Sequence, residues 1–368
     1  MKPKIRILLL CAIGALLLAC HLRQPEPPAT EPPATPAAEA LAIVTPAPTP
    51  QPTPEPTPTP EPTPTPEPTE VPVSDPVILL TDGEVLTCVA DFDFTDPGYT
   101  AADYLGADLT DRVCVEGTVV PYLVGTYERT YTVTDDYGNT TVAVRHVEIV
   151  PAELPEVVMP PEKTVYLTFD DGPCGYTEKL LDVLKKYDAK ATFFVVGQMG
   201  KPELIARMHR EGHSVGVHCY THVYSELYVD EETYLADFRR MQEIIKEQTG
   251  SYTRIFRFPG GSANVASRRN PGLMTRLTKI MEDMGYRYFD WNVLPNDAFP
   301  GTYTTDDVRS RIIGGIKAHP DYAIVLQHDI FWESVLAVEA VLKWGTQNGY
   351  TFRGLDLTSP VMHATVNN

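Results

Sequence analysis

The second half of this 368-residue chain predicts an α/β fold built on a mainly parallel sheet, either open or closed into a barrel. From residue 164 onward, apolar runs suited to strands alternate with stretches in helical spacing. Acidic residues, histidines and an arginine stand at the ends of several of these runs. An all-β pattern and a proline-rich stretch come before them.

Seven runs rich in β-branched and aromatic residues predict strands at 164–169, 191–196, 213–217, 255–258, 286–291, 323–327 and 351–357. Between them, apolar residues recur on one helical face in three sets: Leu180, Leu181, Leu184 and Tyr187; Leu277, Ile280, Met281 and Met284; Val308, Ile312 and Ile316. Each helix can return the chain to begin a parallel neighbour.

Residues 77–150 predict a small all-β domain. Tyr127, Arg129, Tyr131 and Val133 alternate with polar residues, the period of a strand with one buried face, and a turn follows at 135–139. The run GTYERTYTVTDDYGNT resembles bacterial surface immunoglobulin-like domains, which are β-sandwiches. We expect a spacer or wall-contacting role, because this region carries no catalytic pattern.

Residues 1–20 read as an export signal. Three basic residues precede an apolar run at 7–19 that is short for a membrane span. The sequence Leu17-Leu18-Ala19-Cys20 resembles a bacterial lipobox, which implies a lipid anchor at Cys20 on the outer face of the membrane. An uncleaved anchor is the alternative.

Residues 21–76 predict a disordered stalk rich in proline, threonine and glutamate. Twenty of the 35 prolines lie between Pro25 and Pro76, and this segment has no aromatic residue. Such a composition favours an extended, solvated, polyproline-like spacer.

The formal net charge of −19 argues against a nucleic-acid partner, whose phosphates require a basic face. Cys88 and Cys114 both fall in the β-rich region. A disulfide between them and two free thiols are equally compatible with an exported protein.

The stretch TFDDGP at 168–173 and two histidines, His218 and His222, predict a metal site with its own base. Imidazole nitrogen and carboxylate oxygen suit zinc-like ions, and a catalytic site keeps a position open for water. Polar residues mark the carboxyl ends of five predicted strands: Asp170, Asp171, His218, Arg257, Asp290 and His328. That edge is where parallel α/β folds bind ligands.

Read together, TFDDGP, HCYTH at 218–222, RFPGG at 257–261, YFDW at 288–291 and LQH at 326–328 resemble the polysaccharide deacetylases, the NodB-like carbohydrate esterase family 4. The resemblance spans roughly residues 160–357, within a domain that we place at 151–368. It implies a deformed (β/α) barrel of about seven strands and metal-dependent removal of acetyl groups from sugars.

The resemblance implies that Asp171, His218 and His222 hold the metal, with both imidazoles on one side of a helical turn. Zinc is the first choice, and cobalt, nickel or manganese also suit this donor set. Asp170 is left free to act as the general base, paired with Arg257.

For the departing amine, the resemblance implies that His328 donates a proton and that Asp290 orients this histidine. A backbone N–H near Gly260 is expected to stabilise the oxyanion, although Phe258 and Gly260 replace a proline and a tyrosine of the commoner motif. Trp291 is either a sugar platform or part of the core.

Cys174 and Cys219 flank the predicted ligands. Cys219 as an extra ligand, a Cys174–Cys219 disulfide and plain buried thiols are the three alternatives, and buried thiols are favoured.

We therefore predict a monomeric, extracellular lipoprotein that deacetylates a cell-wall polysaccharide, with the N-acetylglucosamine of peptidoglycan as the first choice of substrate. Acetylated xylan and chitin are alternative substrates. A non-catalytic wall-binding protein and an amidase acting on stem peptides are alternative functions.

Overall fold

The computed structural model describes residues 74–298 and 301–366. The predicted signal peptide and nearly all of the predicted stalk lie outside these residues. Among the helices that are described, none has the length and apolar character needed to cross a membrane.

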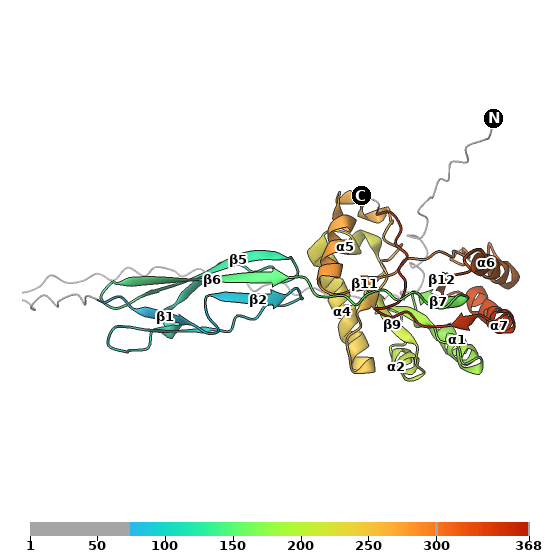
Figure 1. The fold of residues 1–368 in the computed structure, drawn as a ribbon, viewed down its shortest axis with the longest axis horizontal. Coiled ribbons are helices and arrows are strands. Elements are labelled where there is room, and N and C mark those ends of the chain that lie inside the picture. The colour runs from blue at the N-terminus through green and yellow to red at the C-terminus, as the bar shows by residue number, and fades with distance from the viewer. Residues whose placement is uncertain (1–73, 299–300, 367–368) are drawn as a thin grey trace, which may run out of the picture. The chain divides into compact units, whose positions relative to one another are not determined.

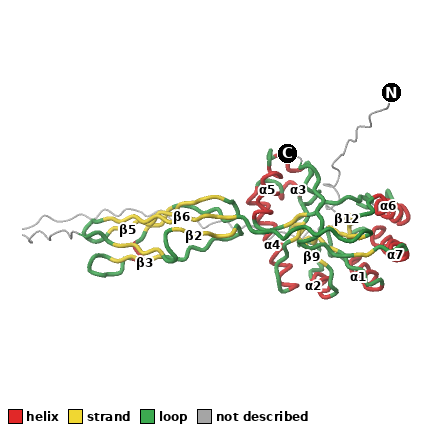
Figure 2. The backbone as a smooth tube through the Cα atoms, in the orientation of Figure 1, coloured by secondary structure: helices red, strands yellow, loops and turns green. Residues whose placement is uncertain are grey.

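The first described region contains two sheets in which most strand pairs are antiparallel (Figures 1 and 2). Strands β1 (Val77–Leu80) and β3 (Tyr99–Ala102) form one sheet. The other has the order β2 (Val85–Val89), β6 (Thr140–Val150), β5 (Gly125–Thr134) and β4 (Cys114–Glu116), and a short 3-10 helix, η1 (Thr110–Arg112), precedes β4. This arrangement agrees with an immunoglobulin-like domain.

The period-2 alternation along β5 is confirmed, because Tyr131 and Val133 are buried while neighbouring residues are more exposed. On β6, the guanidinium of the fully buried Arg145 donates to the carbonyls of Gly83 and Gly98, so a charged group holds two turns in place. The cysteines of this region are free thiols, so the alternative of a disulfide between them is not formed.

The second region contains a seven-stranded sheet in which every pairing is parallel. Its order is β11-β10-β9-β8-β7-β12, and β13 also pairs with β7. The strands are β7 (Thr164–Asp170), β8 (Thr192–Val196), β9 (Ser214–Cys219), β10 (Ile255–Phe256), β11 (Arg287–Tyr288), β12 (Tyr322–His328) and β13 (Thr351–Phe352). All seven predicted strands are therefore present, although four of them, β8, β10, β11 and β13, are shorter than predicted.

Helices lie on the outside of this sheet (Figure 1). They are α1 (Gly175–Lys186), α2 (Glu203–Arg210), α3 (Tyr224–Leu227), α4 (Glu231–Thr249), α5 (Leu273–Asp283), α6 (Thr305–Ala318) and α7 (Trp332–Gln347), with a 3-10 turn, η2, at Ala266–Arg269. The three predicted apolar faces belong to α1, α5 and α6, where their residues are largely buried.

The two faces of the sheet are buried in different ways. Leu167 and Phe169 pack into the large cluster shared with the helices, whereas Tyr166 joins a separate cluster with Phe194 and Phe289. Successive side chains of a strand point to opposite faces, so Thr168 and Asp170 share the inner face with Tyr166. A parallel bridge between Val293 and Val325 joins the segment after β11 to β12. The result is the expected deformed (β/α) barrel.

Strand register brings the predicted chemical residues to one edge. Asp170 ends β7 and lies opposite His328, which ends the neighbouring strand β12. His218 is the penultimate residue of β9, and Arg257 directly follows β10. The carboxyl ends of adjacent parallel strands thus supply most of the candidate site.

Candidate active site

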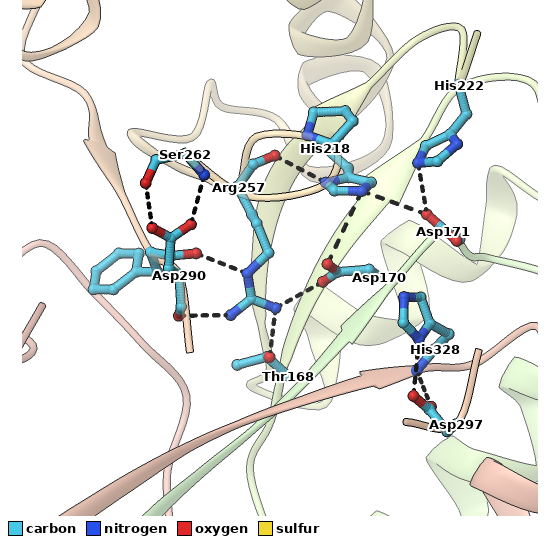
Figure 3. Close-up of polar contacts among 12 residues, drawn as sticks. Thr168, Asp170, Asp171, His218, His222, Arg257, Ser262, Asp290, Asp297 and His328 are labelled. Atoms are coloured by element: carbon cyan, nitrogen blue, oxygen red, sulfur yellow. Dashed lines mark hydrogen bonds and ion pairs between the residues drawn. The ribbon is translucent and has the colours of Figure 1, made fainter. Parts of the chain in front are cut away.

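Asp171, His218 and His222 converge at the carboxyl edge of the barrel (Figure 3). Oδ1 of Asp171 lies 3.4 Å from Nε2 of His218 and 3.2 Å from Nε2 of His222. One candidate ligand atom from each residue lies within 4.8 Å of the others. The structure therefore brings together the three residues that the sequence predicts as metal ligands.

The backbone conformation of Asp171 and a hydrogen bond of His218 orient two of these side chains. Asp171 has a φ of 75°, a left-handed conformation that is uncommon for a residue with a side chain and often marks a functional position. Nδ1 of His218 lies 2.8 Å from the carbonyl oxygen of Arg257. A carbonyl only accepts, so Nδ1 carries the proton and Nε2 is free to bind a cation.

The prediction that both histidines lie on one helical turn is wrong. His218 belongs to strand β9, and His222 lies in the loop after it. That loop is held by Asp237 of α4, whose carboxylate accepts from the backbone N–H groups of Tyr220 at 2.7 Å and Thr221 at 2.9 Å. Asp237 is a positioning residue that the sequence motifs did not reveal.

The donor set fits a tetrahedral ion. Ligands at about 2.0–2.1 Å from a zinc ion lie roughly 3.3 Å from one another in tetrahedral geometry, close to the two separations measured at Asp171. Oδ1 of Asp171 is also buried without a hydrogen bond within the protein. Burial alone would raise the pKa of Asp171, but contact with His218 and the charges of His222 and His328 hold that pKa well below its usual range.

Asp170 is held by Arg257 as predicted. The fully buried guanidinium donates from Nη1 to Oδ1 of Asp170 at 2.8 Å and to the Thr168 hydroxyl at 2.6 Å. Nε donates to the carbonyl of Phe289 at 2.7 Å, and Nη2 donates to the carbonyl of Asp290 at 3.2 Å. Arg257 thus uses its rigid donor geometry to join three segments and to fix the carboxylate beside the candidate metal site.

The predicted pairing of Asp290 with His328 is wrong. Nδ1 of His328 lies 3.0 Å from Oδ1 of Asp297, and the backbone N–H of His328 donates to the other Asp297 oxygen at 2.7 Å. The Ser334 hydroxyl also donates to Asp297 at 2.7 Å. Asp297 comes from the loop after β11. Figure 3 shows it beside His328, whereas Asp290 lies beside Ser262.

Asp290 instead holds the loop that follows Arg257. Its carboxylate accepts from the backbone N–H of Ser262 at 2.9 Å, from the Ser262 hydroxyl, and from the backbone N–H of Ala364 at 2.8 Å. The side chain therefore fixes the 257–262 segment and the chain near the carboxyl terminus.

Charge around His328 favours its protonated form. Burial by itself lowers the pKa of His328, but the carboxylates of Asp297, Asp171 and Asp170 raise it to about 10. Figure 3 shows this imidazole on the side of Asp170 and Asp171, consistent with their influence. The imidazolium form of His328 is therefore favoured at neutral pH.

Asp329 is a buried carboxyl group that, like Asp297, the sequence motifs did not reveal. Thr177 donates to its Oδ2, while Oδ1 is buried without a partner within the protein. Burial, reinforced by the charge of Asp171 and opposed by the Thr177 bond, raises the pKa of Asp329 to about 7. A methyl group on Gly172 would lie 2.1 Å from this carboxylate, so the glycine permits the Asp-Asp-Gly-Pro segment to pass over it.

Gly260 is exposed and has a φ of 77°, and a side chain there would lie 3.3 Å from the hydroxyl of Tyr224. The Tyr224 ring is in turn 5.2 Å from that of His222, so Gly260 borders the site. The other departure from the family motif, Phe258, is fully buried among aromatic rings.

Trp291 packs beneath Arg257. The guanidinium carbon lies 5.6 Å from the centre of the ring. Trp291 also borders the inner apolar cluster of the barrel and is only partly exposed. These contacts favour the core alternative over the sugar platform.

The cysteines near the site are free thiols. Cys219 is buried beside His218 on β9, so its side chain points to the opposite face, and burial raises its pKa well above the usual range. Cys174 caps α1, where its sulfur accepts from the N–H of Tyr176 at 3.3 Å and donates to the carbonyl of Asp329 at 3.4 Å. The alternatives of a Cys174–Cys219 disulfide and of a cysteine ligand are not realised.

A carboxylate held by arginine, an imidazole held by a carboxylate and an Asp/His/His set at one edge of a parallel barrel are the components of a hydrolase. Comparison with known proteins agrees. Residues 158–289 match the polysaccharide deacetylase family, and residues 78–149 match the Ig-like domain of bacterial surface proteins.

Among curated proteins, the chain is 37% identical over 194 residues to the peptidoglycan-N-acetylglucosamine deacetylase of Bacillus cereus, covering 52% of this chain and 68% of that protein. It is 32% identical over 206 residues to a peptidoglycan-N-acetylmuramic acid deacetylase of Bacillus subtilis, covering 53% and 71%. The catalytic-domain structure of peptidoglycan N-acetylglucosamine deacetylase from Eubacterium rectale is 45% identical, with a TM-score of 0.57, and covers 58% of this chain and 98% of that one. The chain belongs to the polysaccharide deacetylase family.

Proposed function

We propose that this protein is a metal-dependent deacetylase that removes N-acetyl groups from the N-acetylglucosamine of peptidoglycan. The observation that carries the proposal is the convergence of Asp171, His218 and His222, with Asp170 and His328 at the ends of adjacent paired strands beside them. A divalent ion held by these three ligands, with zinc as the first choice, would lower the pKa of a bound water and polarise the acetyl carbonyl.

Asp170 is the proposed general base. Arg257, which also donates to the Thr168 hydroxyl, holds one of its carboxylate oxygens. The other oxygen lies 3.9 Å from Nε2 of His218 and faces the ligand set. As water attacks the acetyl carbon, Asp170 accepts a proton from it. Arg257 fixes the orientation of the base through a charge-assisted hydrogen bond.

His328 is the proposed general acid. Attack on the amide gives a tetrahedral oxyanion, for which a backbone N–H near Gly260, in the loop that borders the site, is the proposed donor. The carbon–nitrogen bond then breaks, and His328 gives its proton to the departing amine, leaving acetate and a free amino sugar. Asp297, rather than Asp290, maintains the protonated imidazole.

The choice of substrate rests on the relatives and on the expected placement of the chain. The curated relatives named above act on peptidoglycan amino sugars, and the preceding domain is of a type found on bacterial surfaces. We propose that the chain is exported, anchored at Cys20, and meets the cell wall on the extracellular side of the membrane.

Acetate release tests the proposal. The protein, with added zinc or cobalt, is incubated with peptidoglycan, chitooligosaccharides and acetylated xylan, and acetate is measured. We expect release from peptidoglycan and a loss of about a hundredfold or more in Asp170→Asn, because a general base contributes roughly 10²–10⁴-fold.

Asp188→Asn is the matched control, because Asp188 is an exposed carboxylate with a φ of 48°, a conformation that asparagine also accepts. This control should retain full activity. Equal acetate release by the wild type and Asp170→Asn would refute the proposed mechanism. Preferential release from xylan, or release of peptides in place of acetate, would refute the proposed substrate.

A further inference from the structure

Two exposed aromatic rings contact each other near the candidate active site. Tyr176, in the first turn of α1, is 43% exposed, and Trp332, the first residue of α7, is 40% exposed. Their ring centres are 5.1 Å apart and their planes are tilted by 45°. The pair therefore presents one continuous aromatic surface to solvent.

This pair lies at the same edge of the barrel as the chemistry. Helix α1 follows β7, which ends at Asp170, and α7 follows β12, which ends at His328. These two strands are paired, with Asp170 opposite His328. Figure 1 shows α1 and α7 next to each other beyond those strands. The aromatic pair thus extends outward from the position of the proposed base and acid.

Buried contacts beneath the pair fix it to the site. The sulfur of Cys174 and the hydroxyl of Thr177, which flank Tyr176 in sequence, both bond to Asp329 next to His328. Phe331 lies between His328 and Trp332 in sequence, and its ring is 5.8 Å from the His328 imidazole, edge to face. The rings therefore stand on a framework that is continuous with the catalytic residues.

Exposure of large aromatic rings is unfavourable in water, and it is unusual in this domain. Among the described residues of 151–366, the other strongly exposed aromatic side chain is Tyr252, whose hydroxyl bonds to Lys246 and Glu243. Tyr252 precedes β10 and so lies at the opposite, amino edge of the sheet. The exposed aromatic surface is thus concentrated where a bound glycan would pass.

We propose that Tyr176 and Trp332 form a saccharide-binding subsite, on which a sugar ring of the glycan chain stacks while a neighbouring unit occupies the catalytic centre. Tyrosine and tryptophan provide rigid apolar faces with polar edges, which match the C–H face and hydroxyl rim of a sugar. The inference deepens the proposed function and rests on it. It predicts that the enzyme prefers chains long enough to reach from the metal ligands to the pair.

The test compares a short and a long substrate in Tyr176→Ala, Trp332→Ala and the double variant. The kcat/KM values for acetate release from the N-acetylglucosamine disaccharide and hexasaccharide give a chain-length preference for each protein. Because each ring supplies only part of the contact with the glycan, we expect this preference to fall by about threefold to tenfold, mainly through the KM for the hexasaccharide. Tyr176→Phe should retain the wild-type chain-length preference, and Tyr252→Ala should leave that preference unchanged.

An unchanged preference in the double variant would overturn the subsite. So would an equal loss of kcat on both substrates, since that would mean that the pair only joins α1 to α7. Hexasaccharide binding, measured by calorimetry in Asp170→Asn with and without Trp332→Ala, separates the two proposals. Trp332-dependent binding, together with a wild-type protein that releases no acetate, would support the subsite and refute the deacetylase. Binding independent of Trp332 would refute the subsite.

Discussion

At the scale of single residues, two adjacent carboxylates have different surroundings and therefore different proposed roles. Asp171 adopts a left-handed backbone conformation and faces two imidazoles. Asp170 keeps the extended conformation of β7 and faces a buried guanidinium. The turn in the backbone between them separates the proposed ligand from the proposed base, although the two are neighbours in sequence.

Asp297→Asn should shift the alkaline side of the pH–rate profile to lower pH. The charge of Asp297 is the main influence that raises the pKa of His328, so its removal lowers that pKa and the acid loses its proton earlier as pH rises. The same raised pKa stabilises the fold below the ordinary histidine pKa of about 6.5, and this contribution is lost as pH rises toward 10.

Asp290→Asn is the matched comparison for Asp297→Asn, because Asp290 carries the same group but bonds to Ser262 and Ala364. We expect this variant to keep the wild-type alkaline pKa in kcat/KM, whatever its effect on the overall rate. A lower alkaline pKa in Asp290→Asn, with no change of that pKa in Asp297→Asn, would instead support the pairing of Asp290 with His328 that the sequence predicts.

At the scale of secondary-structure elements, two adjacent glycines in α6 meet very different surroundings. A methyl group on Gly315 would lie 2.3 Å from the side chain of Val293, whereas a methyl group on Gly314 would meet nothing within 4 Å. Val293 bridges to β12 and precedes the loop that carries Asp297. The close approach of α6 at Gly315 therefore supports the segment that holds His328.

Gly315→Ala should lower the free energy of unfolding by about 1–3 kcal/mol, because overpacking forces the helix or Val293 to move. Gly314→Ala should raise it by about 0.5–1 kcal/mol, since alanine favours the helix and meets no neighbour. Denaturant unfolding of the two variants measures both values. Equal effects would mean that helix propensity, and not the contact with Val293, determines the outcome.

The sequence predicted elements well where a periodic pattern was present. Each predicted strand is a short run of β-branched and aromatic residues, and all seven are found, because such strands are buried on both faces. The prediction of one helical turn for His218 and His222 is wrong because a four-residue spacing is not specific to helices. The first histidine still belongs to strand β9.

Asp297 and Asp237 could not be predicted from the motifs. Asp297 lies in an irregular loop without periodicity, and Asp237 lies on α4, outside the histidine motif. Their roles depend on tertiary contacts alone. By contrast, the link from Arg257 to Asp170 follows from the parallel topology, which brings the ends of β7 and β10 to the same edge.

At the scale of the whole molecule, metal binding should stabilise the folded protein. The three proposed ligands come from the residue after β7, from β9 and from the loop after β9, so they converge only in the folded chain. A ligand that binds the native state alone at one hundred times its Kd adds about 2.7 kcal/mol. We therefore expect chelation to lower the Tm by several degrees and zinc to restore it, as measured by calorimetry.

His222→Ala provides the control for metal-linked stability, because it removes one ligand from a loop position without touching a strand. The Tm of this variant should no longer respond to zinc at concentrations that saturate the wild type. A full zinc response in His222→Ala would show that the stabilising ion binds elsewhere.

The direct register of Asp170 against His328 on β7 and β12 has a further consequence. The two residues that we propose to handle protons are spaced at their Cα atoms by a ladder of main-chain hydrogen bonds within the sheet. Adaptation to glycans of different shape would therefore occur in the loops around the site.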